Sequence, residues 1–474
     1  MKMTGDNGTL NNGKSAFAPW AHRARFALTA LFFVALPWQT RWIYRTSPIH
    51  PDAEWGRLSW YASEMLLGVL LLWAIAHAIW LWRTGRFARQ PFTRERWWLV
   101  GALAVLAYGV LRSVLNDAPA AGLQHSWWLL EAVLTIVFLQ SGWFPWRAAV
   151  YGFLIGMTIA ALLGIGQVVF QYAPAQKWLG LAEHIPAQGG ASVVEYGSTR
   201  FLRAYGPFPH PNIFGGYLVA AFLFVILRPR QIGAEGSRTN DGNPPGFFNS
   251  YAGLRSFRMT HRVLTILFTV ALALTFSRGA WIAWIAVLLA ALFVQKNRAF
   301  SSVALSVLTM GVVLGALWPV TITRFDRTAR LEARAIEERT TSVADGIALW
   351  KRTPWFGVGP SQYVNTFFVQ HPPSEADFAW WQLAPPHHTG VALLVEYGAV
   401  GATLVILTAL LFLRSLIKGG EYRPLLWFLP LVALMQFDHY PWSLYSGVML
   451  VALFAGFRTH SIHTISTVDT QIRS

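Results

Sequence analysis

The chain has 474 residues, of which 54% are hydrophobic and 13% are charged, and it contains no cysteine. Soluble domains carry about 25% charged residues, so the composition excludes an ordinary soluble protein, and the lack of cysteine excludes disulfides and thiolate metal sites. The net charge of +16 would favour nucleic-acid binding in a soluble protein. Here the basic residues lie mainly in short segments between apolar runs, an arrangement typical of membrane topology, so we expect no nucleic acid.

Twelve apolar runs approach the length of about 20 residues that a membrane span needs. In chain order they cover residues 26–43, 60–82, 97–115, 125–142, 147–172, 211–228, 262–277, 280–296, 300–320, 389–413, 424–438 and 442–458. Tryptophans often lie at the ends of these runs, as in an interfacial belt. The predicted fold is therefore an all-α integral membrane protein with about twelve transmembrane helices.

The positions of lysine and arginine predict the orientation. Basic residues cluster in every second connection, with examples at Arg83, Arg94, Arg228, Arg258, Lys296 and Arg414. With an even number of spans, these connections share one side with both termini, and the positive-inside rule makes that side cytoplasmic. We expect cytoplasmic tails at 1–25 and 459–474, and a flexible cytoplasmic linker at 229–261 that is rich in Gly, Asn, Pro and Ser. The first apolar run lacks a small-residue cleavage site, so we expect an uncleaved span.

Two outer segments are longer than a connection requires. One is residues 173–210, within the nine predicted spans of 26–320, and the other is 321–388, ahead of the last three spans in 389–458. Long loops in compact proteins are usually functional or disordered. The second segment predicts a helical extracytoplasmic lid, with a charged helix over 324–339, a second helix capped at Ser342, and a third near 361–370.

Motifs of soluble enzymes are absent: there is no phosphate-binding loop with Lys, no zinc-type His-Glu-x-x-His, and no pair of outer acids at metal-ligand spacing. We therefore expect neither metal nor cofactor. Arg, His and Asp residues lie instead at the predicted outer ends of the spans. They are Arg203, His210 and Asn212; Arg278; Arg339 in the lid; His387 and His388; and Asp438 and His439.

Each of these residues alone fits an ordinary structural role, such as an arginine extending to the membrane surface. Together they predict a cluster of Arg and His on one face of the membrane. Guanidinium groups bind phosphate oxygens in a bidentate manner. A histidine that titrates near neutrality can remove a proton from a sugar hydroxyl. The cluster therefore favours a substrate with a phosphate leaving group.

Four motifs, in chain order, resemble the O-antigen ligase and polymerase superfamily of bacterial membrane glycosyltransferases, over residues 195–460. They are Arg203-x-x-Gly206-x-Phe208-x-His210-Pro211-Asn212; Phe276-Ser277-Arg278-Gly279; Arg339 followed by Pro354-x-x-Gly357-Val358-Gly359; and His387 followed by Gly398-x-x-Gly401. Two positions depart from the family pattern. His388 stands where Asn, Ser or Gln is common, and Val343 stands where many members have Trp.

The resemblance implies transfer of a glycan from undecaprenyl pyrophosphate to an acceptor hydroxyl at the outer face of the cytoplasmic membrane, inverting and independent of metal. The acceptor would be a glycan, a lipid such as lipid A core, or a protein. His387 would be the general base, and Arg203 and Arg339 would hold the pyrophosphate. Substrate-binding candidates are Arg278, His210, Asn212, His388, Asp438 and His439.

Three other functions remain open on the sequence. A polymerase would extend the lipid-linked glycan and yield a ladder of products. A protein O-oligosaccharyltransferase would differ only in its acceptor. A transporter of the lipid-linked glycan would use the same arginines to bind an anion, but transporters usually place ionisable residues near the membrane midplane, whereas these lie at one boundary.

Overall fold

The structure is a computed structural model that describes residues 19–49, 53–85, 93–226, 251–370, 384–417 and 422–456, with the backbone alone for 19, 251–259 and 423. Seven helices in the described part are long and apolar enough to cross a membrane. They are α2 (Ala62–Arg83), α3 (Trp97–Val114, extended by the 3-10 turn η1 at Arg94–Arg96), α4 (Pro119–Gln140), α5 (Trp146–Phe170), α8 (Arg278–Gln295), α9 (Asn297–Ala316) and α13 (Thr389–Ser415). The chain is therefore a mostly helical, multi-pass membrane protein.

The other five predicted spans also contain helices, but ones with shorter apolar parts. They are α1 (Pro19–Ala35), α6 (Pro211–Ile226), α7 (Tyr251–Leu274, with Thr260–Leu274 as its apolar part), Pro424–Phe437 (η5 at Arg423–Phe428 with α14 at Leu429–Phe437) and Tyr445–Gly456. Each apolar run thus contains helix, while the count of twelve crossings stays a prediction. The first run, predicted as a span over 26–43, is corrected: its helix ends at Ala35, and its last residues belong to a strand over Arg41–Arg45. The predicted tails and the linker 229–261 lie largely outside the described residues.

Helix α6 is the most deeply buried of these helices, and small residues allow its close packing. A Cβ on Gly215 would lie 2.6 Å from the Cβ of Ala280 in α8, and one on Gly216 would lie 2.2 Å from the hydroxyl of Tyr440. Small residues at helix contacts let membrane helices approach each other closely. This packing fixes the start of α6 beside the start of α8 and the short helix α15 (Tyr440–Ser443).

Two antiparallel hairpins occur in the described outer segments, which the all-α prediction missed. Strands β1 (Arg41–Arg45) and β2 (Leu58–Tyr61) pair in the segment after α1. Strands β3 (Val193–Tyr196) and β4 (Thr199–Leu202) pair between α5 and α6. Neither hairpin closes into a larger sheet among the described residues.

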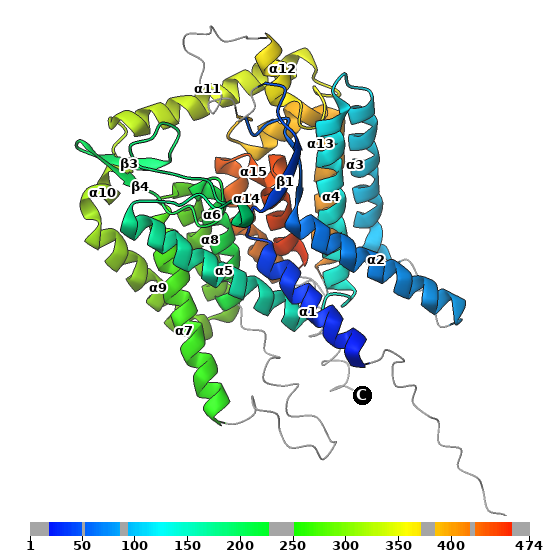
Figure 1. Ribbon diagram of the computed structural model, residues 1–474, viewed down its shortest axis with the longest axis horizontal. Coiled ribbons are helices and arrows are strands. Elements are labelled where there is room, and N and C mark those ends of the chain that lie inside the picture. The colour runs from blue at the N-terminus through cyan, green and yellow to red at the C-terminus, as the bar shows by residue number, and fades with distance from the viewer. Residues whose placement is uncertain are drawn as a thin grey trace, which may run out of the picture.

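The lid consists of α10 (Trp318–Thr323), α11 (Arg330–Arg352) and α12 (Tyr363–Gln370). The third predicted helix is confirmed, but the prediction of a helix start at Ser342 is wrong, because α11 runs through it unbroken. The Ser342 hydroxyl donates to the carbonyl of Arg339 at 3.0 Å, one turn back in the same helix. Figure 1 shows α11 crossing one end of the helices, from the β3–β4 hairpin towards α12.

After α11, a turn that contains Gly357 and Gly359 (the glycine turn) joins the lid to α13. Gly398 interrupts α13 with a φ of 64°. Just before it, carbonyl groups of α13 are free to accept hydrogen bonds from the turn. The amides of Val358 and Gly359 donate to the carbonyls of Val395 and Glu396, both at 2.9 Å. The lid is therefore joined to a transmembrane helix through main-chain hydrogen bonds.

Candidate active site

A cavity of about 860 Å³ lies under α11, between the two hairpins and the ends of the transmembrane helices. Seven of the nine predicted site residues line it. They are Arg203, His210, Asn212, Arg339, His387, Asp438 and His439. Residues far apart in the sequence thus meet at one end of the molecule.

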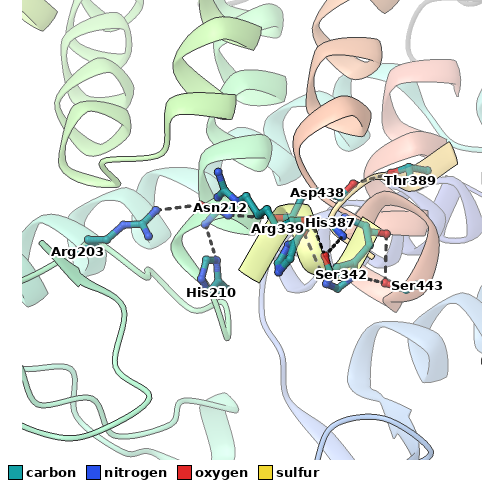
Figure 2. A network of polar contacts seen from close by, with 10 residues as sticks. Arg203, His210, Asn212, Arg339, Ser342, His387, Thr389, Asp438 and Ser443 are labelled. Atoms are coloured by element: carbon teal, nitrogen blue, oxygen red, sulfur yellow. Dashed lines mark hydrogen bonds and ion pairs between the residues drawn. The ribbon is translucent and has the colours of Figure 1, made fainter. Parts of the chain in front are cut away.

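Asp438 is the centre of the polar contacts, and Figure 2 shows it joined to Arg203 through Asn212. The Nη2 of Arg203 donates to the Oδ1 of Asn212 at 2.9 Å. The Nδ2 of Asn212 then donates to the Oδ2 of Asp438, also at 2.9 Å. The other carboxylate oxygen accepts the backbone amide of His439 at 2.8 Å. Asp438 directly follows α14, so the end of that helix delivers it to the cavity.

His387 faces the same carboxylate. Its Nδ1 lies 3.6 Å from the Oδ1 of Asp438 and is buried without a closer partner among the described residues. Its backbone amide donates to the hydroxyl of Ser342 in α11 at 3.3 Å, and the hydroxyl of Thr389 donates to the carbonyl of Asp438 at 2.7 Å. The ring is therefore positioned from both the lid and the last outer turn, with Nδ1 towards Asp438.

The charges around Asp438 follow from burial and pairing. Burial alone would raise the pKa of the Asp438 carboxyl, but the interactions with His387 and His439 outweigh it and hold that pKa well below its usual range. Burial lowers the pKa of His439 to about 4, although the Asp438 charge opposes this. At neutral pH, Asp438 is an anion and His439 is neutral. The His439 Nδ1 lies 2.6 Å from the Ser443 hydroxyl.

Arg203 is a cation in an unfavourable place. Its side chain is buried, with 6% of the residue exposed, and its Nε donates to the carbonyl of Thr275 at 2.7 Å. Burial, and then the positive charge of Arg324, push the pKa of Arg203 well below its usual range. A bound anion would relieve this repulsion.

Arg339 differs from the other arginines of the cavity. Arg324 pairs with Glu332, Arg330 with Glu195, and Arg334 with Glu338. Within the described ranges, no acidic or carbonyl partner of the Arg339 side chain is found. Figure 2 shows Arg339 near Asp438 and His387, and it also lines a smaller cavity with Asn212 and Asp438.

Two predicted site residues do not line the cavity. Arg278 donates to the carbonyl of Arg324 at 3.0 Å and pairs with Glu332 at 3.1 Å, so it joins the start of α8 to α11. His388 caps α13: its Nδ1 accepts the amide of Val391 at 3.3 Å, and its Nε2 lies 3.0 Å from the Oε1 of Gln436.

His210 lines the cavity but acts locally. Its Nδ1 accepts the backbone amide of Asn212 at 3.1 Å, at the start of α6. Burial, and then the charge of Arg203, lower the pKa of His210 to about 3, so its ring is neutral. The ring therefore orients Asn212, which carries the contact between Arg203 and Asp438.

The sequence did not reveal the cavity wall formed by the first outer segment. Glu54 and Trp55, which precede β2, line the cavity. Their only sequence signal was a Trp-Gly pair in an outer connection. Arg200 and Gly190, from the β3–β4 region, also contribute.

One group of side chains has the geometry of a metal site. The ligand atoms of His387, Asp438 and His439 lie within 4.8 Å of one another. Such N and O ligands suit zinc. The positive charges of Arg203 and Arg339, which line the same cavity, oppose a metal cation there.

The fold and the site together define a class of protein: a helical membrane protein with a cavity lined by Arg and His. Residues 263–406 match the O-antigen ligase family, which confirms the resemblance to the O-antigen ligase superfamily over this part of the chain. The match supports a membrane glycosyltransferase of the ligase and polymerase family. It includes Arg339 and His387, whereas Arg203 and Asp438 lie outside it. Comparison with curated proteins gave no match.

Proposed function

We propose that the protein transfers a glycan from undecaprenyl pyrophosphate to a hydroxyl of an acceptor such as lipid A core, at the outer face of the cytoplasmic membrane. The main support is one cavity that holds the His387–Asp438 pair beside the buried Arg203 and the unpaired Arg339. The family match supports the same class of reaction.

The reaction begins with the acceptor hydroxyl at the Nε2 of His387. This nitrogen takes the proton as the acceptor oxygen forms its bond to the anomeric carbon of the glycan. The anionic Asp438, opposite Nδ1 at 3.6 Å, stabilises the resulting imidazolium and selects the ring orientation. His387 is thus the general base, and Asp438 is its positioning residue.

The bond that breaks joins the anomeric carbon to the pyrophosphate oxygen. Its electron pair leaves with undecaprenyl pyrophosphate, and negative charge develops on that oxygen. Arg339 and Arg203 are the cations that receive this charge. Fixed donors that face developing charge in a water-poor site commonly contribute about 3 kcal/mol each to lowering a barrier.

The test uses purified protein in lipid vesicles with an undecaprenyl-pyrophosphate glycan and lipid A core. We expect transfer by the parent and by a His22→Ala control, whose histidine is exposed on α1. His387→Ala should lose about 10²-fold or more in kcat. Full activity of His387→Ala would remove the general-base role. A ladder of extended donor in place of a single transfer would identify a polymerase.

A further inference from the structure

The first outer segment places an aromatic ring beside the proposed base. Trp55 lines the same cavity as His387 and Asp438 and is only partly buried. Its ring meets that of His439 edge to face, with centroids 5.3 Å apart, and the ring of His439 lies 5.3 Å from that of His387. Trp55 is therefore separated from the base by a single side chain.

The backbone around Trp55 is held firmly. Both oxygens of the preceding Glu54 accept from Arg41 of β1, at 2.5 and 2.6 Å. The following Gly56 has a φ of +78°, and a Cβ there would lie 3.0 Å from the ring of Pro48. The Arg41 guanidinium also donates to the hydroxyl of Tyr61, at the end of β2. The hairpin thus presents Trp55 in a fixed orientation, which limits the entropy lost when a ligand binds.

The order of contacts indicates whether Trp55 lies on the acceptor side or on the leaving-group side of the proposed base. From Arg203 the contacts run through Asn212 to Asp438, then to His439 and finally to Trp55. Of the two proposed phosphate ligands, Arg203 contacts Asn212, and Arg339 lines a small cavity with Asn212 and Asp438 but without Trp55. Trp55 is therefore at the end of this series of contacts that is away from both arginines. In an inverting displacement the acceptor oxygen approaches opposite the leaving group, which places the acceptor on the Trp55 side of the base.

We propose that Trp55 is the stacking platform for a pyranose ring of the acceptor glycan, a role that rests on the function proposed above. One face of a pyranose carries C–H groups that pack on an aromatic ring, while its hydroxyls point outward to polar groups. Polar groups are present here. A small cavity of about 40 Å³ beside Trp55 is lined by Arg41, Glu54 and Gln124, which is room for about one or two waters or hydroxyl groups.

Trp55 lies outside the segment that matches the family, so acceptor choice is carried by a part of the chain that the family match does not describe.

The kinetic test compares Trp55→Leu with Trp42→Leu, a control on strand β1 of the same hairpin that does not line the cavity. Trp55→Leu should raise the KM for lipid A core about five- to tenfold, with kcat and donor KM within about twofold of the parent. Trp55→Phe keeps a ring against His439 and should raise acceptor KM by about two- to threefold. Equal rises in donor and acceptor KM, or an unchanged acceptor KM in both variants, would overturn the proposal.

A binding measurement separates this inference from the proposed function. The probe is the oligosaccharide released from lipid A core, titrated into full-length His387→Ala protein with or without Trp55→Leu or Trp55→Phe. The Trp55 variants should weaken binding by the same factors as in the kinetic test. If glycan binding depends on Trp55 but the parent transfers nothing, the transfer reaction is wrong and the glycan site stands. If the Trp55 variants bind like the His387→Ala protein, or that protein does not bind the probe, the platform is wrong.

Discussion

At the residue scale, Arg339 is the clearest target, because its guanidinium has no acidic or carbonyl partner in the described chain. Lysine keeps the charge but cannot bind two phosphate oxygens through a planar fork. We expect Arg339→Lys to lose about 10²-fold in kcat and Arg339→Gln to lose more, with donor KM changed less. Measurement of kcat and KM with the lipid-linked donor checks this.

The matched control is Arg327→Lys, an exposed arginine just before α11 that lines neither cavity. It should keep the parent's turnover. If Arg339→Lys turns over like Arg327→Lys, then Arg339 does not bind the leaving group.

The buried histidines predict how stability depends on pH. The pKa is lowered to about 4 for His439 and to about 3 for His210, from an unfolded value of about 6.5. As the pH falls from about 6.5 towards about 4, the unfolded chain therefore binds more protons than the folded chain. The free energy of unfolding should fall across that window, by at most about 1.4 kcal/mol per pH unit for each histidine.

Thermal unfolding in detergent from about pH 7 to about pH 4.5 measures this slope, and His439→Gln should flatten it. The low pKa of Asp438 also makes stability fall as the pH falls, but below this window, because the unfolded carboxyl takes up its proton only near its usual pKa of about 3.9. A midpoint that is independent of pH over this range would mean that His439 and His210 are not held neutral by burial.

The sequence located most of the site residues for a physical reason. Ionisable residues at the ends of apolar runs are costly unless they meet water, a partner or a ligand, which singled out Arg203, His387 and Asp438. It did not distinguish a ligand-binding arginine from a paired one. Arg278 carries a family motif, yet it contacts Glu332, whose position depends on how α11 lies over the helices. Trp55 reaches the cavity only through the fold of the first hairpin.

At the element scale, the contact between the glycine turn and α13 is a point where no side chain fits. A Cβ on Gly398 would lie 2.4 Å from the carbonyl oxygen of Trp355, and its φ of +64° also disfavours other residues. We expect Gly398→Ala to lower the free energy of unfolding by at least about 2 kcal/mol and to loosen the lid. Thermal unfolding and limited proteolysis of the lid measure both effects.

Gly311→Ala is the control, because nothing lies within 4 Å of a Cβ at that position in α9. Alanine favours helix over glycine by up to about 1 kcal/mol, so this variant should be neutral or slightly more stable. If Gly398→Ala melts like Gly311→Ala, then the backbone approach between the turn and α13 is not as close as described.

Secondary structure was predictable to different extents in and out of the membrane. Apolar runs specify helix strongly because a backbone in lipid must satisfy its own hydrogen bonds, and all twelve runs contain helix. Outer segments have water as an alternative partner, so local patterns were ambiguous. Ser342 has the residue type of a helix cap, but its hydroxyl accepts the amide of His387 from another element. The β1–β2 hairpin is stabilised by the Arg41–Glu54 ion pair, which no local sequence pattern predicts.

At the scale of the whole molecule, the absence of cysteine allows a direct test of topology. Ser198 is exposed in the β3–β4 turn, on the side predicted to be outer, and Ser141 is exposed between α4 and α5, on the side predicted to be cytoplasmic. In intact cells, a membrane-impermeant maleimide should label Ser198→Cys but not Ser141→Cys. After cell lysis both should react, which controls for reactivity. Labelling of Ser141→Cys alone in intact cells would invert the predicted orientation.

The unbroken course of α11 ties three parts of the cavity to the turns of one helix. Glu332, Arg339 and Ser342 follow one another at intervals of seven and three residues, so they share one stripe of its surface. That stripe meets the start of α8, the proposed leaving-group site and the backbone of His387, respectively. A slip of one residue would rotate α11 by about 100° and withdraw all three contacts together. The correct placement of α11 therefore brings Arg339 and His387 into position together. If the helix is misaligned, both groups are withdrawn, and the bond between glycan and pyrophosphate is not cleaved.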